Sequence, residues 1–287
     1  MSESDVLVRI PTYIPSIDKI IGGGMPVGTT MLIVAEPGSG GQEFIFTSIA
    51  NYCRELKSST FPISEDIHHP ESVYYVTQKS SKSTFIRMMK QQFTYLDSID
   101  FEKGLLDKHV IFLDIGDIFF ARSIVPHTWY SNKSITEHLM HLPPSDEYGG
   151  LTYLAGLVDK VPEYSTVYMD CLTPYLSYFS DPDKWRHLVS LLYGISRAAQ
   201  SRHITFLFLL TANILTQTKE IEIGNAFGAI LHLGWQKSPT AMTRQRQMYI
   251  EKFVGVLSTL APRDIAIYNV SVSLDTGFEI SNLRRVT

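Results

Sequence analysis

Cysteine is scarce in this sequence, which has only Cys53 and Cys171 among its 287 residues. Two cysteines do not make the disulfide framework that stabilises small secreted domains, so we expect the chain to work in a reducing cytoplasm. Long apolar segments are also missing. The most apolar run, "ITFLFLLTANIL", is too short to cross a bilayer, and the first residues lack the basic and apolar regions of a signal peptide. We therefore expect neither a membrane protein nor a secreted one.

Charge of one sign does not dominate the sequence either. The formal net charge is −4, and 44% of the residues are hydrophobic. A chain with this balance has no global positive field that would favour nucleic acid, and it has enough apolar side chains for a sizeable core. Because we find no internal repeat or low-complexity tract that divides the chain, we predict a single domain spanning 1–287.

The order of the expected elements indicates an α/β fold. Apolar segments at 30–35, 72–77, 109–115, 165–171 and 203–210 are expected strands, and helical patterns begin near 42, 82, 151 and 181. Strands that alternate with helices predict a mostly parallel central sheet flanked by helices. After 226 the remaining segments follow one another as strands without helices, which predicts C-terminal antiparallel strands at one edge of the sheet.

Helical spacing of apolar residues defines the buried face of three expected helices. The first helix has Ile45, Ile49, Cys53 and Leu56 on this face. The second, expected to run from about 82 to 95, has Phe85, Met89 and Phe93. The third has Trp185, Leu188, Leu192 and Ile195. The third helix is expected to start with Ser180 or Asp181 as its N-cap and Pro182 in its first turn. Cys53 is therefore interpreted as a core residue.

The stretch 116–150 shows no readable pattern. It is rich in aromatic residues, contains the turn "LPPSD", and is longer than ordinary connections between elements. We predict that it is an inserted lid or interaction segment.

The segment "IVAEPGSGGQEF", residues 33–44, is similar to a phosphate-binding loop of the pattern G-x-x-x-x-G-K-[ST]. Aligned on that pattern, Ala35 stands at the first glycine and Gly40 at the second. Gly41 then takes the position of the lysine, and Gln42 takes that of the hydroxyl residue. The glycines that bend a backbone around an anion are present, whereas the two side chains that carry the chemistry are absent.

Three segments together resemble the RecA-like ATPases, and among them the KaiC-like family that is common in archaea. The first, "YIPSIDKIIGGGMPVGTTMLIVAEPGSG", resembles the family's lead-in to its phosphate loop and matches it at Gly22, Gly23, Gly24, Pro26, Gly28, Glu36, Pro37, Gly38, Ser39 and Gly40. "VYMDCLTPYL" resembles the Walker B strand, and "FEISN" resembles the closing strand. The resemblance covers most of the chain and implies a RecA-like P-loop core, ATP or ADP with Mg²⁺ as the cofactor, and assembly with other subunits.

The resemblance also implies roles for individual residues. Asp170 corresponds to the Walker B carboxylate that would hold a hydrated Mg²⁺, and Thr211 and Asn213 correspond to residues that sense the γ-phosphate. The vestigial nucleotide-binding set is Glu36, Pro37, Gly38, Ser39, Gly40, Gly41, Gln42 and Glu43.

Each departure from the family pattern falls on a position with a chemical role. Gly41 cannot neutralise phosphates, and Gln42 cannot offer the hydroxyl that binds Mg²⁺. Where the family has acidic residues that orient the attacking water, this chain has Gln78 and Lys79, and Glu43 places a carboxylate near the would-be γ-phosphate. We therefore predict a pseudo-ATPase without catalytic residues, with weak or no nucleotide binding. It would act as a regulatory or assembly partner of itself or of an active RecA/KaiC-like paralogue.

Three alternatives stay open from the sequence. The loop can be a tight turn that is kept only for packing. The chain can be a weak ATPase with displaced catalytic residues, in which Lys79 and Lys82 act as substitute cations. It can also resemble a recombinase paralogue that binds single-stranded DNA. The expected helix that starts near 82 carries Phe85 and several basic residues on it or just before it: Lys79, Lys82, Arg87 and Lys90.

The other candidate groups are interpreted structurally. His68 and His69 lie in an expected loop with nothing that fixes a metal geometry. Asp181 and Asp183 are typical of a helix start, and Cys171 has no catalytic partner in view. The basic residues of the C-terminal strands are either edge-strand charges or contacts to a neighbouring subunit's nucleotide: Lys237, Arg244, Arg246, Lys252, Arg263, Arg284 and Arg285.

Overall fold

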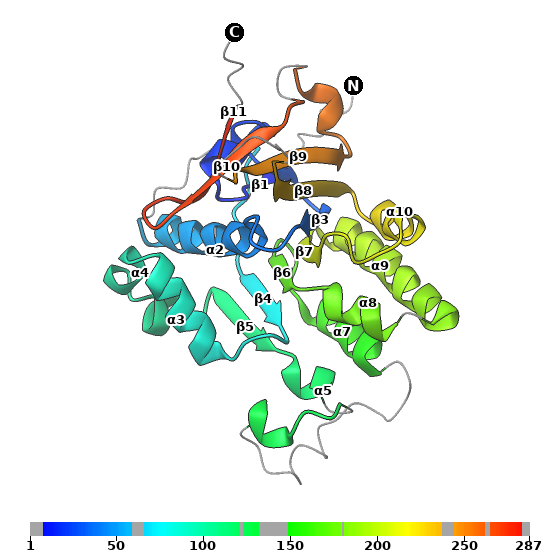
Figure 1. The fold of residues 1–287 in the computed structure, drawn as a ribbon. Coiled ribbons are helices and arrows are strands. Elements are labelled where there is room, and N and C mark those ends of the chain that lie inside the picture. The colour runs from blue at the N-terminus through cyan, green and yellow to red at the C-terminus, as the bar shows by residue number, and fades with distance from the viewer. Residues whose placement is uncertain are drawn as a thin grey trace.

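The computed structural model describes residues 8–58, 66–120, 123–131, 149–179, 181–236, 244–261 and 265–282. Its centre is a nine-stranded sheet with the strand order β11-β10-β9-β8-β3-β7-β6-β4-β5 (Figure 1). The strands are β3 (Thr30–Ala35), β4 (Val73–Thr77), β5 (Val110–Asp114), β6 (Thr166–Asp170), β7 (Thr205–Thr211), β8 (Ala229–Trp235), β9 (Arg246–Phe253), β10 (Tyr268–Ser273) and β11 (Gly277–Asn282). The expected α/β architecture is confirmed.

The sheet has a parallel and an antiparallel part. The six strands from β8 to β5 in the spatial order pair parallel with one another, and β9, β10 and β11 then pair antiparallel. Strand β8 corrects our expectation, because it belongs to the parallel part. The chain returns to it through a helix that we missed, α10 (Gln217–Asn225). That helix buries only Ile223 and Gly224, so its sequence has no clear apolar stripe.

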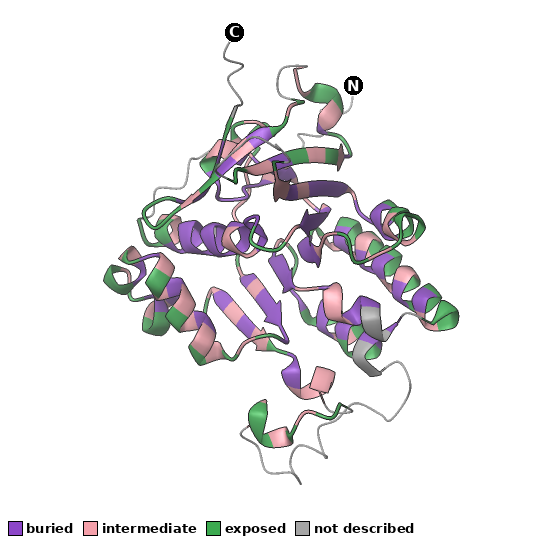
Figure 2. Ribbon diagram, in the orientation of Figure 1, coloured by how far each residue is buried: buried purple, intermediate pink, exposed green. Residues whose placement is uncertain are grey.

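Helices cover both faces of the sheet. On one face lie α2 (Gly41–Ser58), α3 (Lys82–Gln92) and α4 (Tyr95–Ser98), and on the other lie α7 (Gly149–Lys160), α8 (Thr173–Tyr178), α9 (Pro182–Arg202) and α10 (Figure 1). Because side chains alternate along a strand, β3 sends Met31 and Ile33 to the first face and Leu32 and Val34 to the second. The central strands are buried throughout, as Figure 2 shows.

The predicted helix faces are confirmed. Among the predicted positions on α2, α3 and α9, all are buried except Leu56, which is partly buried against the core. The second helix ends at Gln92, and Phe93 is its C-cap, so our expected end at 95 was too late. Asp181 is the N-cap of α9 and accepts a hydrogen bond from the Asp183 backbone N–H at 3.1 Å, whereas Ser180 lies outside the described residues.

The glycines of the lead-in allow close backbone approaches. A short ribbon joins β1 (Arg9–Ile10) to β2 (Met25–Pro26), next to α1 (Pro15–Asp18). Gly24 has a φ of 150°, and a Cβ at that position would lie 2.4 Å from the Ile10 carbonyl oxygen. The matching glycines before β3 therefore serve the backbone geometry of this turn.

The segment 116–150 is described only in part. It begins with α5 (Gly116–Phe120), continues in a 3₁₀ turn at His127–Trp129, and ends where α7 starts. Phe119 packs against Tyr175 of α8 with ring centroids 5.7 Å apart. Residues 121–122 and 132–148 lie outside the described part, so the lid or interaction role stays a prediction.

Three short helical segments complete the described elements. They are α4, a π-helix at Phe101–Leu105 and a 3₁₀ turn at Leu257–Thr259. Within the described ranges, every helix is too short or too polar to pass through a lipid bilayer.

Candidate functional site

The loop between β3 and α2 keeps the bent backbone that its glycines predict. Gly38 and Gly40 have φ values of 75° and 116°, in the region that favours glycine. Ser39 is fully buried, and its hydroxyl donates to the Glu36 carbonyl at 2.7 Å. The loop therefore folds as a tight strand-to-helix turn of the kind that presents N–H groups to an anion.

Strands β8 and β9 hold the outer side of this loop. The indole Nε1 of Trp235 donates to the Pro37 carbonyl at 3.1 Å, and Arg246 Nε donates to the Gly38 carbonyl at 2.9 Å. The guanidinium groups of Arg244 and Arg246 lie 4.5 and 5.2 Å from the centroid of the Trp235 ring, within range of a cation–π interaction. The sequence did not single out Trp235, because nothing local links it to a loop nearly 200 residues earlier.

The lysine position of the loop pattern is filled by packing. Gly41 is buried, and a Cβ built on it would lie 2.6 Å from Leu209 Cδ1 and 2.8 Å from Ala35 Cβ. Both distances are below the 3.0 Å that real Cβ atoms respect. Ala35 itself stands where the pattern has a glycine. The two departures from the pattern are thus complementary. Alanine in place of glycine at Ala35 adds a methyl group, and glycine in place of lysine at Gly41 removes the side chain that would contact it.

Asp170 ends β6, is fully buried, and has donors on both carboxylate oxygens. Lys79 Nζ lies 3.2 Å from Oδ1, and Oδ2 accepts from the Tyr75 hydroxyl at 2.6 Å and from Gln42 Nε2 at 3.2 Å. These donors come from α2, from β4 and from the turn after β4. The peptide bond between Asp170 and Cys171 is cis.

Burial shapes the protonation of the neighbours of Asp170. It raises the pKa of Tyr75 well above its usual value, and the Asp170 charge and hydrogen bond raise it further. Tyr75 therefore stays protonated, and its hydroxyl donates a hydrogen bond to the Asp170 carboxylate. Burial also raises the pKa of Cys171, with Asp170 as the second cause, so this thiol stays protonated and is a poor nucleophile.

A magnesium ion does not fit this donor set. Mg²⁺ needs near-octahedral oxygen ligands and keeps several waters. Here an ammonium already holds one oxygen of Asp170, and the residue at the hydroxyl position, Gln42, directs its amide N–H at the other. The arrangement can neutralise a buried carboxylate, but it offers neither the metal nor the lysine that stabilise a transferring phosphoryl group.

The two positions expected to carry acidic residues differ in their surroundings. Gln78 is buried and donates from Nε2 to the Cys171 carbonyl at 3.0 Å. Lys79 is half exposed. Glu43 lies partly buried in the first turn of α2. The structure thus brings Gln42 and Lys79 together on Asp170. Gln78 bonds to the backbone of the next residue, Cys171.

The sensor-like residues contact the chain itself. Thr173, at the start of α8, donates from Oγ1 to Thr211 Oγ1 at 3.0 Å and accepts from the Thr211 backbone N–H at 2.9 Å. Asn213 is exposed and has a left-handed φ of 63°. Its conformation is that of a turn residue.

Most of the basic residues near α3 have acidic partners. Lys79 binds Asp170, Lys82 pairs with the exposed Asp107, and Lys90 pairs with Asp97 and Glu102. Of the two lysines considered as substitute cations, Lys79 lies at Asp170, whereas Lys82 is paired with Asp107. Because these charges are largely compensated, the helix gives little support to a surface for nucleic acid.

The remaining candidates behave as structural groups. The Tyr13 hydroxyl and His69 Nδ1 are hydrogen-bonded at 2.9 Å, His68 packs on Tyr164, and the described residues contain no cluster of metal-ligating side chains. Lys252 Nζ donates to the Gly224 carbonyl at 3.2 Å. Lys237, Arg263, Arg284 and Arg285 lie outside the described residues.

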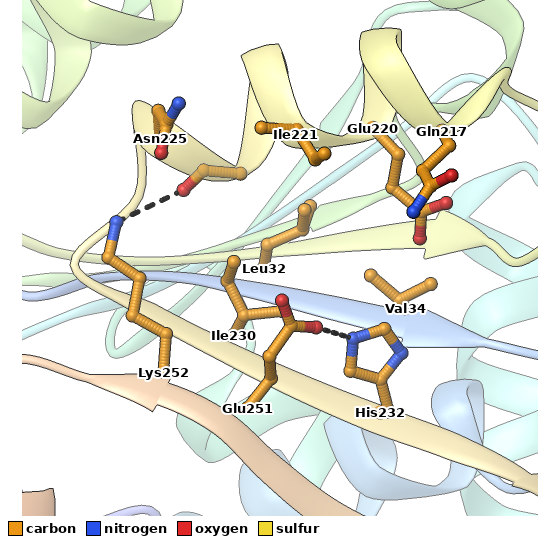
Figure 3. A pocket seen from close by; sticks show the side chains of 11 residues that line it. Leu32, Val34, Gln217, Glu220, Ile221, Asn225, Ile230, His232, Glu251 and Lys252 are labelled. Atoms are coloured by element: carbon orange, nitrogen blue, oxygen red, sulfur yellow. Dashed lines mark hydrogen bonds and ion pairs between the residues drawn. The ribbon is translucent and has the colours of Figure 1, made fainter.

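A cavity of about 300 Å³ lies under α10 (Figure 3). Its floor is formed by Leu32, Val34 and Ile230. Two of its charged side chains already have partners, since Glu251 bonds to His232 and Lys252 bonds to the Gly224 carbonyl. None of the residues of the vestigial nucleotide-binding set lines this cavity.

The nine-stranded sheet, with helices on both faces and antiparallel strands at one edge, has the fold of a KaiC-like protein. Among solved structures, the chain is similar to a KaiC-like protein from the hyperthermophilic archaeon Pyrococcus horikoshii OT3, with a TM-score of 0.60 over 96% of this chain and 99% of that one. The two sequences are 15% identical, so the likeness establishes the fold alone. No protein-family model and no curated protein sequence matches the chain.

Proposed function

We propose that this protein is a catalytically inactive KaiC/RecA-like protein, a pseudo-ATPase, that acts as a regulatory or assembly partner in the cytoplasm and binds nucleotide weakly or not at all. One observation carries the proposal: Gly41 stands at the lysine position of the loop, where any side chain would have to displace Leu209 and Ala35. Phosphoryl transfer depends on positioning and charge stabilisation, so the loss of this cation removes a main source of catalysis.

The proposed partner is a protein, either a second copy of this chain or an active RecA/KaiC-like paralogue. In support, Trp235 and Arg246 donate hydrogen bonds to the Pro37 and Gly38 carbonyls of the bent loop. A subunit whose loop is held by its own side chains can keep its place in an assembly while others turn over nucleotide. We further propose that the chain forms one domain, with 116–150 as its lid or interaction segment.

Thermal unfolding with and without nucleotide tests the proposal. A ligand that binds only the folded state at a hundred times its Kd adds about 2.7 kcal/mol, which for a chain of this size raises Tm by about 4 °C. We expect a smaller shift, or none, with millimolar Mg-ATP or Mg-ADP, and no phosphate release above a buffer blank. An active KaiC-like ATPase measured in parallel provides the positive control.

Each result of this experiment has a distinct meaning. Stabilisation by sulfate alone would show that the backbone anion site survives without the side-chain chemistry. Turnover that vanishes in Asp170→Ala but survives in Glu43→Ala would contradict the proposal and indicate an ATPase with displaced catalytic residues. Light scattering of the chain alone, and mixed with a candidate paralogue, tests the assembly part, which fails if the chain stays monomeric in both.

A further inference from the structure

The pocket at the end of β6 contains a positive charge that belongs to the protein. Strands β4 and β6 pair in parallel with Thr77 opposite Asp170. Lys79 follows Thr77 by two residues, so the turn after β4 places its side chain over the carboxylate. The ammonium then lies 3.2 Å from Asp170 Oδ1. The register of two neighbouring strands therefore brings a cation to the position where the fold family would use a metal.

The other contacts of Asp170 are built around this charge. Tyr75 precedes Thr77 by two residues, so both lie on the same face of β4. Gln42 lies in the first turn of α2. Tyr75 and Gln42 both donate to Oδ2, which leaves Oδ1 for Lys79. A buried carboxylate requires such compensation, since an unpaired buried charge is strongly destabilising.

The side chains that donate to Asp170 differ in their exposure to solvent. Asp170 has 1% of its side chain exposed, whereas Lys79 has 52% exposed. Tyr75 is fully buried and closes the inner side of the carboxylate. Lys79 is thus the donor that lies between Asp170 and solvent, on the side from which an ion would enter.

We propose that Lys79 is the resident cation of this site and that it takes the place of the divalent metal, so that the site is metal-independent while Lys79 is present. Gln42 assists by directing an N–H, in place of a ligating oxygen, at the second carboxylate oxygen. The inference rests on the proposed function, because a site that turns over nucleotide would need the metal. It goes further by naming the residue that excludes the ion.

Metal binding in the absence of nucleotide tests this inference. The full-length chain and its variants are titrated with Mn²⁺ and followed by electron paramagnetic resonance, and Tm is measured in EDTA and in 10 mM Mg²⁺. The wild type is expected to bind no Mn²⁺ at this site and to show the same Tm in both solutions. Lys79→Ala frees Oδ1, and Lys79→Glu places a second carboxylate beside it. We expect each variant to gain Mn²⁺ binding that the wild type lacks, with Lys79→Glu the tighter of the two.

Three controls separate metal exclusion from a merely structural role. Lys79→Arg keeps a cation and is expected to exclude Mn²⁺, as the wild type does. Lys79→Glu combined with Asp170→Asn removes the carboxylate and should lose the acquired binding. Lys82→Ala, three residues away and paired with Asp107, should leave metal binding unchanged. If Lys79→Ala does not fold, Lys79→Gln replaces it.

The inference is overturned if the wild type binds Mn²⁺ in a manner lost in Asp170→Asn, or if removal of the Lys79 charge confers no metal binding in a folded variant. Because the assay contains no nucleotide, it can fail while the proposed absence of turnover stands. Phosphate release by the wild type, in contrast, would contradict the proposed function and, because turnover needs the metal, the metal exclusion as well.

Discussion

The segments before and after strand β3 differ in how closely their residues match the family pattern. At the amino end, the matching glycines support close backbone contacts, such as that of Gly24 with Ile10. At the carboxyl end, the glycines that bend the loop remain, but the ligand-binding positions hold Gly41 and Gln42. Gly41 packs on Leu209, and Gln42 bonds to Asp170. Positions that serve the backbone match the pattern, whereas the positions of the pattern's lysine and hydroxyl take part in the protein's own packing and hydrogen bonding.

The largest expected effect comes from restoring the lysine of the loop. Gly41→Lys should lower the free energy of unfolding by about 3 kcal/mol or more, because the side chain overpacks Leu209 and Ala35 and brings a charge into a buried place. Adding Ala35→Gly removes one of the two contacts and should recover part of the loss. Denaturant unfolding measures both variants. A Gly41→Lys protein as stable as the wild type would show that packing does not close this end of the strand.

The amino end can be tested with a single methyl group. Gly24→Ala should cost about 3 kcal/mol, since its Cβ would lie 2.4 Å from a carbonyl oxygen at a φ of 150°. The matched control is Gly194→Ala in α9, where a Cβ meets nothing within 4 Å. That change should stabilise the protein by up to about 1 kcal/mol. Equal effects at the two sites would mean that the lead-in does not need its glycine.

The lead-in also predicts a pH dependence. Asp18 Oδ1 accepts from Thr12 N and Thr12 Oγ1 at 2.8 Å each, yet burial raises the pKa of Asp18 to about 7 despite these hydrogen bonds. The folded state therefore binds this proton more tightly than the unfolded state. Its contribution is complete below the unfolded pKa near 4 and is lost as pH rises to about 7, with a slope of up to about 1.4 kcal/mol per pH unit.

Asp18→Asn removes this titration and should flatten the stability profile between pH 4 and pH 7. Burial also raises the pKa of Glu55, so the relevant measurement is the difference between the two profiles and not the wild-type slope alone. Urea unfolding at several pH values provides it. Parallel profiles would contradict the assignment to Asp18.

The smallest expected effect concerns the outer side of the loop. Arg246→Ala removes the hydrogen bond to the Gly38 carbonyl and the contact with Trp235, which should cost about 1 kcal/mol or less because the group is exposed. Amide exchange at Gly38 and Gly40 should become faster. Arg186→Ala, an exposed residue paired with Asp183, is the control and should leave that exchange unchanged. If both variants behave alike, Arg246 does not hold the loop.

Much of the fold could be predicted from local sequence patterns. Continuous apolar segments located five of the parallel strands, because strands buried on both faces are apolar throughout. Helical spacing located the buried faces of α2, α3 and α9, because burial on one face imposes its period on the sequence. The prediction failed at α10, which buries few side chains, and consequently at β8, whose direction depends on that helix. The glycine spacing predicted the bent loop between β3 and α2.

The sequence by itself determined which groups the site lacks, since the residue types at Gly41, Gln42, Gln78 and Lys79 can be read directly. Only the tertiary structure decided what takes their place. Lys79 and Asp170 are 91 residues apart, and they meet because β4 and β6 are neighbours in the sheet. Leu209 reaches Gly41 because β7 pairs with β3. Local periodicity carries no information on which strands become neighbours, and these contacts depend on that order.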